Sequence, residues 1–293
     1  MIEEAARRPD GAPARAGRST SDRRTGGRWG ERSLTALAAL FALFLGLPVI
    51  TLVVRAVVDG SLAIAVASPV VLDALRLSLV TTAVSLVITV TFGLPLAFVL
   101  ARRKFRGKGL VEAIVDLPIV LPPAVAGLAL LLVFGRRGLL SAPFELLGIS
   151  VPFTTIAVIL AQTFVSAPFF IRSARTGLAG VDRDLEDAAR VDGASERQLF
   201  RDVTIPLAGA ALAAGLTMSW ARSLGEFGAT IMFAGNVEGR TQTLPLVVYG
   251  EFQGGNLDAS IAAAAILALA AFGVLVAVRV FHWGRVLDAR AVG

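Results

Sequence analysis

The sequence has no cysteine and a single histidine, His282. The absence of cysteine excludes disulfide frameworks, thiolate zinc sites, iron–sulfur clusters and cysteine nucleophiles. With one histidine, histidine-rich metal sites and Ser-His-Asp triads with several candidate bases are not expected. Only 17% of the 293 residues are charged, against about 25% in ordinary soluble domains. The chain therefore lacks most of the side chains that enzymes use for acid, base and metal chemistry.

Charge is so scarce that six long segments contain no Asp, Glu, Lys or Arg. These segments are residues 33–54, 77–101, 117–135, 146–171, 203–221 and 259–278. A helix needs roughly 20 mostly apolar residues to cross about 30 Å of hydrocarbon. Six such segments exclude a soluble globular protein, and they also exclude a membrane barrel, whose strands would be about 10 residues of alternating polarity. The sequence predicts an all-α polytopic membrane protein with about six transmembrane helices.

The predicted spans set the domain boundaries. They lie at about 34–56, 76–100, 112–135, 152–172, 206–233 and 259–281. A transmembrane domain at 34–285 then lies between an N-terminal tail, 1–33, and a short C-terminal tail, 286–293. The N-terminal tail is rich in arginine and has no apolar periodicity, so we expect it to be disordered.

Prolines interrupt the third predicted span, at Pro118, Pro122 and Pro123. Because freed backbone groups need partners inside a membrane, this predicts a bent helix within a bundle rather than an isolated anchor. A packing kink and a role in a gate both stay open. Between the last two spans, the glycine-rich segment 234–258 contains the apolar piece 244–249, which predicts a short helix.

Basic residues are distributed unevenly between the two sides of a six-span topology. Lysine and arginine concentrate in 1–33, 101–109, 173–204 and 282–293. By the positive-inside rule these segments, and therefore both termini, are expected in the cytoplasm. The basic tail at 1–33 is interpreted as a topological signal, with binding of nucleic acid or anionic lipid as the alternative.

The segment 182–206 is unusually charged for this chain. Asp182 or Asp184 can cap a helix at 184–192, where acids also suit the helix dipole. Gly193 would end that helix. An apolar stripe on a second short helix follows, made of Leu199, Phe200 and Val203. The segment therefore predicts a helix–turn–helix outside the membrane.

Small residues in this segment have a defined spacing. Asp187-Ala188-Ala189 is followed after three residues by Gly193, and after nine more by Val203-Thr204-Ile205-Pro206. Ala189 and Gly193 share a helical face, where another protein can approach the backbone closely. The alternative, a solvated loop between spans, would not need this pattern. The spacing resembles the signature loop Glu/Asp-Ala-Ala-x3-Gly-x9-Ile-x-Leu-Pro of binding-protein-dependent ABC importer permeases, with aliphatic replacements at 203 and 205.

The resemblance extends over about residues 70–285, and the chain looks most like permeases for the tetrahedral oxyanions molybdate, tungstate and sulfate. It rests on Arg106-Gly107-Lys108, Asp116-Leu117-Pro118-Ile119-Val120-Leu121-Pro122-Pro123, Phe134-Gly135-Arg136-Arg137-Gly138, Ser223-Leu224-Gly225-Glu226-Phe227-Gly228-Ala229-Thr230 and Gly235-Asn236. The Pro-Pro pair and the Gly-Arg-Arg-Gly piece favour the molybdate branch.

This resemblance implies a permease subunit of an ATP-driven oxyanion importer in the inner (plasma) membrane of a prokaryote. Molybdate is favoured, with tungstate or sulfate/thiosulfate as alternatives. Two copies would pair in the lipid bilayer, and an extracytoplasmic binding protein would deliver the anion. A cytoplasmic ABC ATPase dimer would carry the ATP and Mg, since this chain has no Gly-x4-Gly-Lys-Ser/Thr loop. We expect no enzyme activity, bound cofactor or nucleic-acid partner of this chain. The implied ATPase-docking residues are Glu186, Asp187, Ala188, Ala189, Gly193, Val203, Ile205 and Pro206.

Several polar residues fall inside the predicted spans. Arg222 and Glu226 are four apart, and charges in a membrane usually face a cavity or each other. A structural ion pair and a place along the anion path both remain open for them, and Asp116 is interpreted as structural. Thr163 and Ser166 could line the path, or donate to a carbonyl one turn back in the same helix.

Two other function classes fit the sequence less well. Secondary transporters often contain inverted repeats and broken helices around charged sites, but no convincing internal repeat is present and the 182–206 segment would be unexplained. A membrane-embedded enzyme is disfavoured by the lack of cysteine and of clustered acids in the spans.

Overall fold

A computed structural model describes the backbone of residues 25–148 and 150–291, and the side chains of 33–148 and 150–276. The chain divides into two units, residues 1–50 and 51–293. The described part of the first unit belongs to helix α1 (Thr25–Val58). Its apolar section, Ser33–Val58, is long enough to cross a membrane, in agreement with the first predicted span. Most of the predicted tail, and the side chain of His282, lie outside the described residues.

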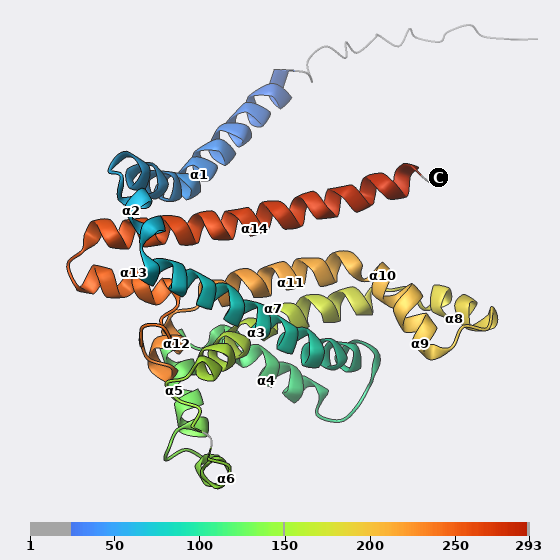
Figure 1. The fold of residues 1–293 in the computed structure, drawn as a ribbon. Coiled ribbons are helices and arrows are strands. Elements are labelled where there is room, and N and C mark those ends of the chain that lie inside the picture. Colours follow the sequence, from blue (N-terminus) through green and yellow to red (C-terminus); the bar gives the residue numbers. More distant parts are fainter. Residues whose placement is uncertain (1–24, 149, 292–293) are drawn as a thin grey trace, which may run out of the picture. The chain divides into compact units, whose positions relative to one another are not determined.

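The regular elements of the second unit, within the described residues, are all helical (Figure 1). They are α2 (Ser61–Ala67), α3 (Pro69–Arg102), α4 (Lys108–Val120), α5 (Pro123–Phe134), α6 (Ser141–Leu146), α7 (Thr155–Ala179), α8 (Arg183–Val191), α9 (Glu196–Gln198), the π-helical turn η1 (Leu199–Thr204), α10 (Ile205–Leu207), α11 (Gly209–Leu224), α12 (Gly228–Phe233), α13 (Leu244–Gln253) and α14 (Leu257–Ala291). The short helix predicted at 244–249 is confirmed as part of α13.

Four described helices are long and apolar enough to cross a membrane, and two bent helix pairs raise the number to as many as six. The four are Ser33–Val58 of α1, α3, α7 and Leu257–Val276 of α14. The all-helical, polytopic fold class predicted from the charge-free segments is therefore confirmed.

The third predicted span, 112–135, is not one helix. It consists of α4 and α5, which meet at an angle of 119°. Leu121 is extended, with φ −67° and ψ 134°, because a residue before proline is disfavoured in the helical region. Pro122 and Pro123 then begin α5 without an N–H of their own, which is tolerated at a helix start. The proline-dense sequence thus produces a break sharper than the predicted bend.

The fifth predicted span, 206–233, is also interrupted. α11 ends at Leu224, and Gly225 to Phe227 separate it from α12. At its other end, the helical segment Glu196–Leu207 meets α11 at 71°. Glu226 was predicted to lie within a continuous span, whereas it lies in this break.

The buried face of α3 explains how these helices pack. Small and hydroxyl side chains recur every three or four residues along it, namely Ala74, Ser78, Thr82, Ser85, Thr89, Gly93 and Ala97. Large apolar side chains such as Val87 and Phe92 are 65% and 71% exposed. In membrane helix bundles, small residues lie at the contacts between helices and large apolar residues face outward, where lipid covers them. The surface of α3 follows this pattern.

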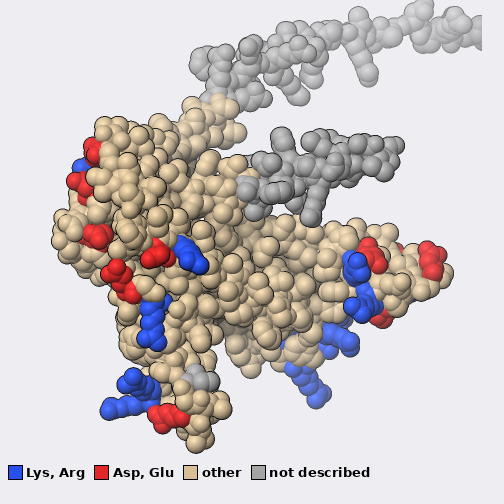
Figure 2. Space-filling view, viewed as in Figure 1, with Lys and Arg blue, Asp and Glu red and all other residues tan. Residues whose placement is uncertain are grey.

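α3 and α7 pack along most of their lengths and run parallel. Thr163 lies 3.1 Å from Ser85 through their hydroxyls, and further along both helices Gly93 faces Ile171. α11 also packs against α7 but runs in the opposite direction. Gly177, near the end of α7, faces Ala211, near the start of α11, whereas the earlier Phe170 faces the later Gly215. Figure 2 shows, on one face, the charged side chains gathered toward the two ends of this unit, with an uncharged belt between them.

The close packing of α5 on α12 predicts a specific sensitivity at Gly127. A Cβ at this position would lie 2.6 Å from the carbonyl oxygen of Ala229 and 2.8 Å from Cβ of Met232. We expect Gly127→Ala to lower the thermal unfolding midpoint of the purified protein in detergent, because overpacking costs about 1–3 kcal/mol.

Gly109→Ala in α4 is the matched control, since a Cβ there meets nothing within 4 Å. Alanine should leave that helix as stable or more stable. Equal unfolding midpoints for the two variants would contradict the packing of α5 against α12.

Candidate functional site

The segment 182–206 folds into two short helices that extend beyond the ends of α7 and α11 (Figure 1). Asp182 is the N-cap of α8, and its carboxylate accepts a hydrogen bond from the N–H of Asp184 at 3.0 Å. This confirms the predicted helix and its cap. Acidic residues in the first turn, Asp184 and Glu186, suit the positive end of the helix dipole.

Gly193 ends α8 in a Schellman motif. The N–H of Ala194 donates to the carbonyl of Ala189, and the N–H of Gly193 donates to that of Arg190, each at 3.0 Å. Gly193 has φ +91°, a left-handed conformation that favours glycine, and a Cβ there would meet nothing within 4 Å. The glycine is therefore required by the backbone of the turn and not by crowding.

A capping box begins the second short helix. The Ser195 hydroxyl accepts from the N–H of Gln198, and the Gln198 side chain accepts from the N–H of Ser195. The π-helical turn η1 then leads into α10 and α11. In η1 Leu199 is buried, and Phe200 packs edge-on against Phe98 of α3 with ring centroids 5.2 Å apart.

A buried ion pair attaches this helix–turn–helix to α3. The Glu186 carboxylate accepts from Nη2 of Arg102 at 2.7 Å and from the hydroxyl of Thr204 at 2.8 Å, both on its Oε1 atom. The side chains of Arg102 and Glu186 are only 11% and 9% exposed. One carboxylate thus joins the last residues of α3, the start of α8 and the end of η1.

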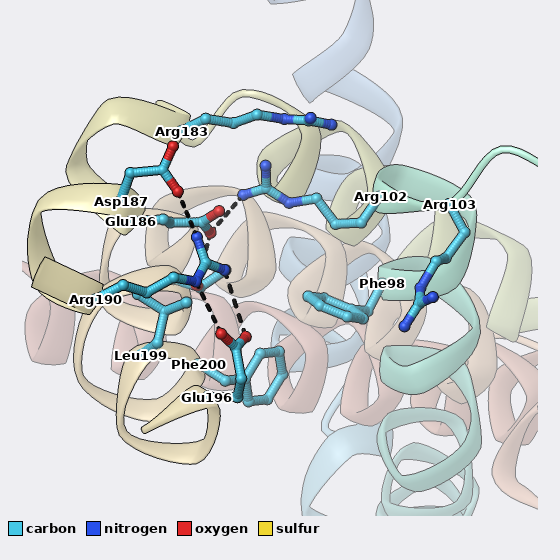
Figure 3. Close-up of a pocket in the computed structure, with 11 residues that line it drawn as sticks. Phe98, Arg102, Arg103, Arg183, Glu186, Asp187, Arg190, Glu196, Leu199 and Phe200 are labelled. Carbon is cyan, nitrogen blue, oxygen red and sulfur yellow. Dashed lines mark hydrogen bonds and ion pairs between the residues drawn. The ribbon is translucent and has the colours of Figure 1, made fainter. Parts of the chain in front are cut away.

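A second, exposed cluster fixes the two short helices to each other. Arg190 donates to Asp187 at 2.7 Å and to Glu196 at 2.8 Å (Figure 3). The hydrogen bond with Arg190 holds the pKa of the Glu196 carboxyl below its usual value, and the same bond raises the pKa of the Arg190 guanidinium. Arg190, Asp187 and Glu196 form an exposed clasp, in which both Arg190 and Glu196 are held in their charged forms.

A cavity of about 360 Å³ lies between the end of α3 and α8, α9 and η1. Figure 3 shows its lining, with Phe98 and Arg103 of α3 on one side and Asp187 and Arg190 of α8 on the other. Within the described residues, no group of three or more Asp, Glu or His side chains is placed to hold a metal ion.

The predicted docking residues fall into two sets. Asp187, Ala188, Gly193 and Pro206 are exposed, whereas Ala189, Val203 and Ile205 are half-buried. Glu186 is buried and faces the protein interior. The helix also exposes two apolar side chains that the motif does not contain, Leu185 at 51% and Val191 at 87%.

Sequence reasoning missed three residues that hold the segment in place. Arg102, Thr204 and Arg190 each bond to an acid of the motif region. Arg102 was counted only as one of the basic residues at 101–109. Arg102 ends a span and is followed by a charged loop. Nothing in that local sequence indicates that its partner is a residue 84 positions later.

The five polar residues predicted to lie within spans, which are Arg222, Glu226, Asp116, Thr163 and Ser166, have different contacts in the structure. Arg222 pairs with Glu226, whose side chain is fully buried. Asp116 lies 3.6 Å from Arg172 in a partly exposed pair. The Thr163 hydroxyl donates to the carbonyl of Ile159, one turn back, at 2.7 Å.

Ser166 is fully buried, and its hydroxyl has no hydrogen-bond partner among the described residues. The structure therefore brings together Arg222 with Glu226 but does not gather all five intramembrane candidates at one place.

The Arg102–Glu186 pair predicts a non-additive response to substitution. Arg102→Leu alone leaves a buried carboxylate without its cation, which costs about 3 kcal/mol or more. We expect a lower unfolding midpoint and faster tryptic cleavage at the arginines of α8 and α9. Arg102→Leu combined with Glu186→Leu should recover part of this loss. Additive effects of the two replacements would show that the residues do not interact.

The chain matches the family described as binding-protein-dependent transport system inner membrane component over residues 93–290. It is 40% identical, over 84% of its length and 89% of the relative's, to a probable molybdenum ABC transporter permease protein of Haloferax volcanii. It is 36% identical, over 83% and 92%, to a molybdate/tungstate transport system permease protein of Pyrococcus abyssi.

Among solved structures, the chain resembles the bacterial alginate ABC transporter in complex with an alginate-bound periplasmic protein. The TM-score is 0.67 at 18% identity, covering 85% of this chain and 91% of the other. At that identity the likeness concerns the fold. The family match covers the α8–α9 segment and all of the helices from α4 to α13. This chain belongs to the inner-membrane permease family of binding-protein-dependent ABC transport systems.

Proposed function

We propose that this chain is the membrane-spanning subunit of an ATP-driven importer for molybdate, and that residues 182–206 couple it to a separate ATPase. The observation that carries the coupling role is the α8 helix itself. It extends beyond the bundle and exposes Ala188 and Val191, while its inner acid, Glu186, binds Arg102. A docking helix needs an exposed surface and firm attachment to the rest of the protein. Little side-chain and loop entropy is then lost when the partner binds.

The proposed partners follow from the family. A dimer of cytoplasmic ABC ATPases carries ATP and Mg and receives one such helix from each of two permease copies. An extracytoplasmic binding protein delivers the anion at the other face. The basic residues at 101–109, near the docking helix, and the other basic segments support a cytoplasmic position for both termini under the positive-inside rule.

The contacts around Glu186 suggest how movement reaches the membrane. When the ATPase subunits close, a force on α8 acts on Arg102 of α3 through the ion pair, and on Thr204 before α11 through the hydrogen bond. α3 and α11 both pack on α7. Displacement of α8 would therefore move α3, α7 and α11 together and would not only bend a loop. Such a concerted movement suits a change between two discrete states.

The substrate assignment rests on two supports. Relatives at 36–40% identity over more than four fifths of the chain carry names that specify molybdenum or molybdate and tungstate. The sequence pieces Pro122-Pro123 and Gly135 to Gly138 also favour the molybdate branch. Tungstate is the first alternative, because it shares the charge and tetrahedral geometry of molybdate, and sulfate/thiosulfate is the second. Arg222 and Glu226, which are proposed either to line the anion path or to form a structural ion pair, lie beside the break between α11 and α12.

Gly193 provides a sharp test of the docking loop. Gly193→Val should abolish oxyanion uptake by the complete transporter, because a β-branched residue strongly disfavours φ +91°. Gly193→Asn is the matched control, since asparagine tolerates the left-handed region and a Cβ meets no atom within 4 Å. Uptake into cells, with membrane insertion measured in parallel, distinguishes the two.

Ala189→Asp complements this pair by placing a charge on the docking face without changing the turn. It should also abolish uptake in a protein that still inserts. Normal transport by Gly193→Val and by Ala189→Asp would overturn the assignment of 182–206 as the docking segment.

Substrate identity is tested on the binding protein encoded with this permease. Calorimetry with molybdate, tungstate and sulfate should give the tightest binding for molybdate. A protein that binds only sulfate would refute the molybdate assignment while leaving the coupling role intact.

A further inference from the structure

A charged pair lies where α11 ends and the break before α12 begins. Arg222 is in the last turn of α11, and its Nη1 contacts Oε2 of Glu226 at 2.5 Å. The Glu226 side chain is fully buried, whereas 28% of the Arg222 side chain is exposed. Because α11 begins at Gly209 and rises about 1.5 Å per residue, the Cα atom of Arg222 is about 20 Å along the helix from its start.

The two helix breaks of the structure meet beside this pair. A Cβ on Gly228, at the start of α12, would lie 2.7 Å from Cβ of Pro123, at the start of α5. Further along, Gly127 of α5 is equally close to Ala229 of α12. α5 and α12 therefore begin side by side and run in the same direction. In secondary transporters, interrupted helices that meet within the membrane form the substrate site, and the two breaks of this chain have the same arrangement.

The two oxygens of Glu226 face different groups, one through a hydrogen bond and the other through an ion pair. Oε1 accepts a hydrogen bond from the N–H of Ala229 at 2.7 Å, which caps α12, and Oε2 faces Arg222. The carboxylate is thus fixed by the backbone of α12 and fully buried, and it holds the guanidinium from one side. Arg222 has five N–H donors, and among the described residues its guanidinium has no further ion-pair or hydrogen-bond partner.

The backbone groups at the starts of α5 and α12 attract anions weakly. The start of α12 is occupied by Glu226, and α5 begins with Pro122 and Pro123, which have no N–H. The guanidinium of Arg222 is therefore the strongest anion-attracting group at the breaks. Its charge is compensated by Glu226, so an anion can be attracted without being held tightly.

We propose that Arg222 contacts the tetrahedral oxyanion as it passes the two helix breaks, and that Glu226 positions the guanidinium and weakens its hold on the anion. The inference rests on the proposed transport of an oxyanion. It assigns different roles to two residues that form one ion pair. Arg222 touches the substrate, whereas Glu226 acts through Arg222.

The absence of cysteine allows a direct test with one introduced thiol. Met218 is one helical turn before Arg222 on the same face of α11 and is 54% exposed. In the purified full-length Met218→Cys protein, a charged methanethiosulfonate should modify the thiol. Molybdate should slow this reaction, about tenfold when its concentration is about ten times its Kd, and chloride at equal ionic strength should not. Leu216→Cys, on another face of α11, is the control position that molybdate should not protect.

Changes at the pair then separate the two roles. Adding Arg222→Gln to Met218→Cys should remove the protection by molybdate, and Arg222→Lys should retain part of it. Since Arg222→Gln leaves Glu226 without its cation, the variant that also carries Glu226→Gln must give the same result. Glu226→Gln alone can still cap α12, and it should shift protection to lower molybdate concentrations because the guanidinium is no longer compensated.

Three results would overturn the inference. They are a thiol at position 218 that does not react, protection that is equal with and without Arg222, and a reactive thiol that molybdate does not protect. The assay needs neither the ATPase nor ATP, so its failure is distinguishable from a failure of the docking segment. Protection by sulfate and phosphate as strong as that by molybdate supports a path that recognises the oxyanion class, with selection left to the binding protein.

Discussion

One buried carboxylate determines how the exposed helix α8 is joined to the membrane bundle. Glu186 binds Arg102 at the end of α3 and Thr204 at the end of η1, and it is almost completely withdrawn from solvent. An uncompensated charge in that position would be strongly unfavourable. The pair therefore has to stay closed in any state that keeps α8 packed, and movement of α8 is transmitted to α3. The exposed Arg190 clasp only holds α8 to α9, and its replacement should matter less.

The second constraint is the requirement that backbone groups inside a membrane find partners. The chain breaks two spans and satisfies the breaks locally. Pro122 and Pro123 have no N–H to satisfy, and Glu226 supplies an acceptor for the N–H of Ala229. The glycines at 127 and 228 let the two resulting half-helices pack at backbone distance. The same features that make the breaks tolerable place a guanidinium at their junction.

Much of the fold could be predicted from the distribution of charge. Charge-free runs of the right length indicated spans, and the acidic cap and Gly193 indicated helix α8 and its end. These signals are local, because helix length, capping and turn conformation depend on neighbouring residues. The sharp break at Leu121 was underestimated, since a proline pair is compatible with either a kink or a stop, and packing of α5 against α12 decides between them.

The contacts that organise the site were not predictable in this way. Arg102 and Glu186 are joined by tertiary structure, and nothing at residue 102 marks it as different from Arg103. The fully buried position of Ser166 likewise depends on how α3, α7 and α11 assemble. Its hydroxyl was weighed as a path residue, but a side chain inside the core of one subunit cannot reach an open passage without rearrangement.

The central claim is that the exposed face of α8 contacts the ATPase. Val191, the last residue of α8, and Leu146, the last residue of α6, are both apolar and highly exposed, at 87% and 90%, and Figure 1 shows α8 and α6 at two separate ends of the second unit. Cross-linking from a single introduced cysteine at each position, in membranes that contain the complete transporter, compares the two ends directly. The account predicts that Val191→Cys forms a cross-linked product with the ATPase subunit and that Leu146→Cys does not. A product from Leu146→Cys but not from Val191→Cys would contradict it.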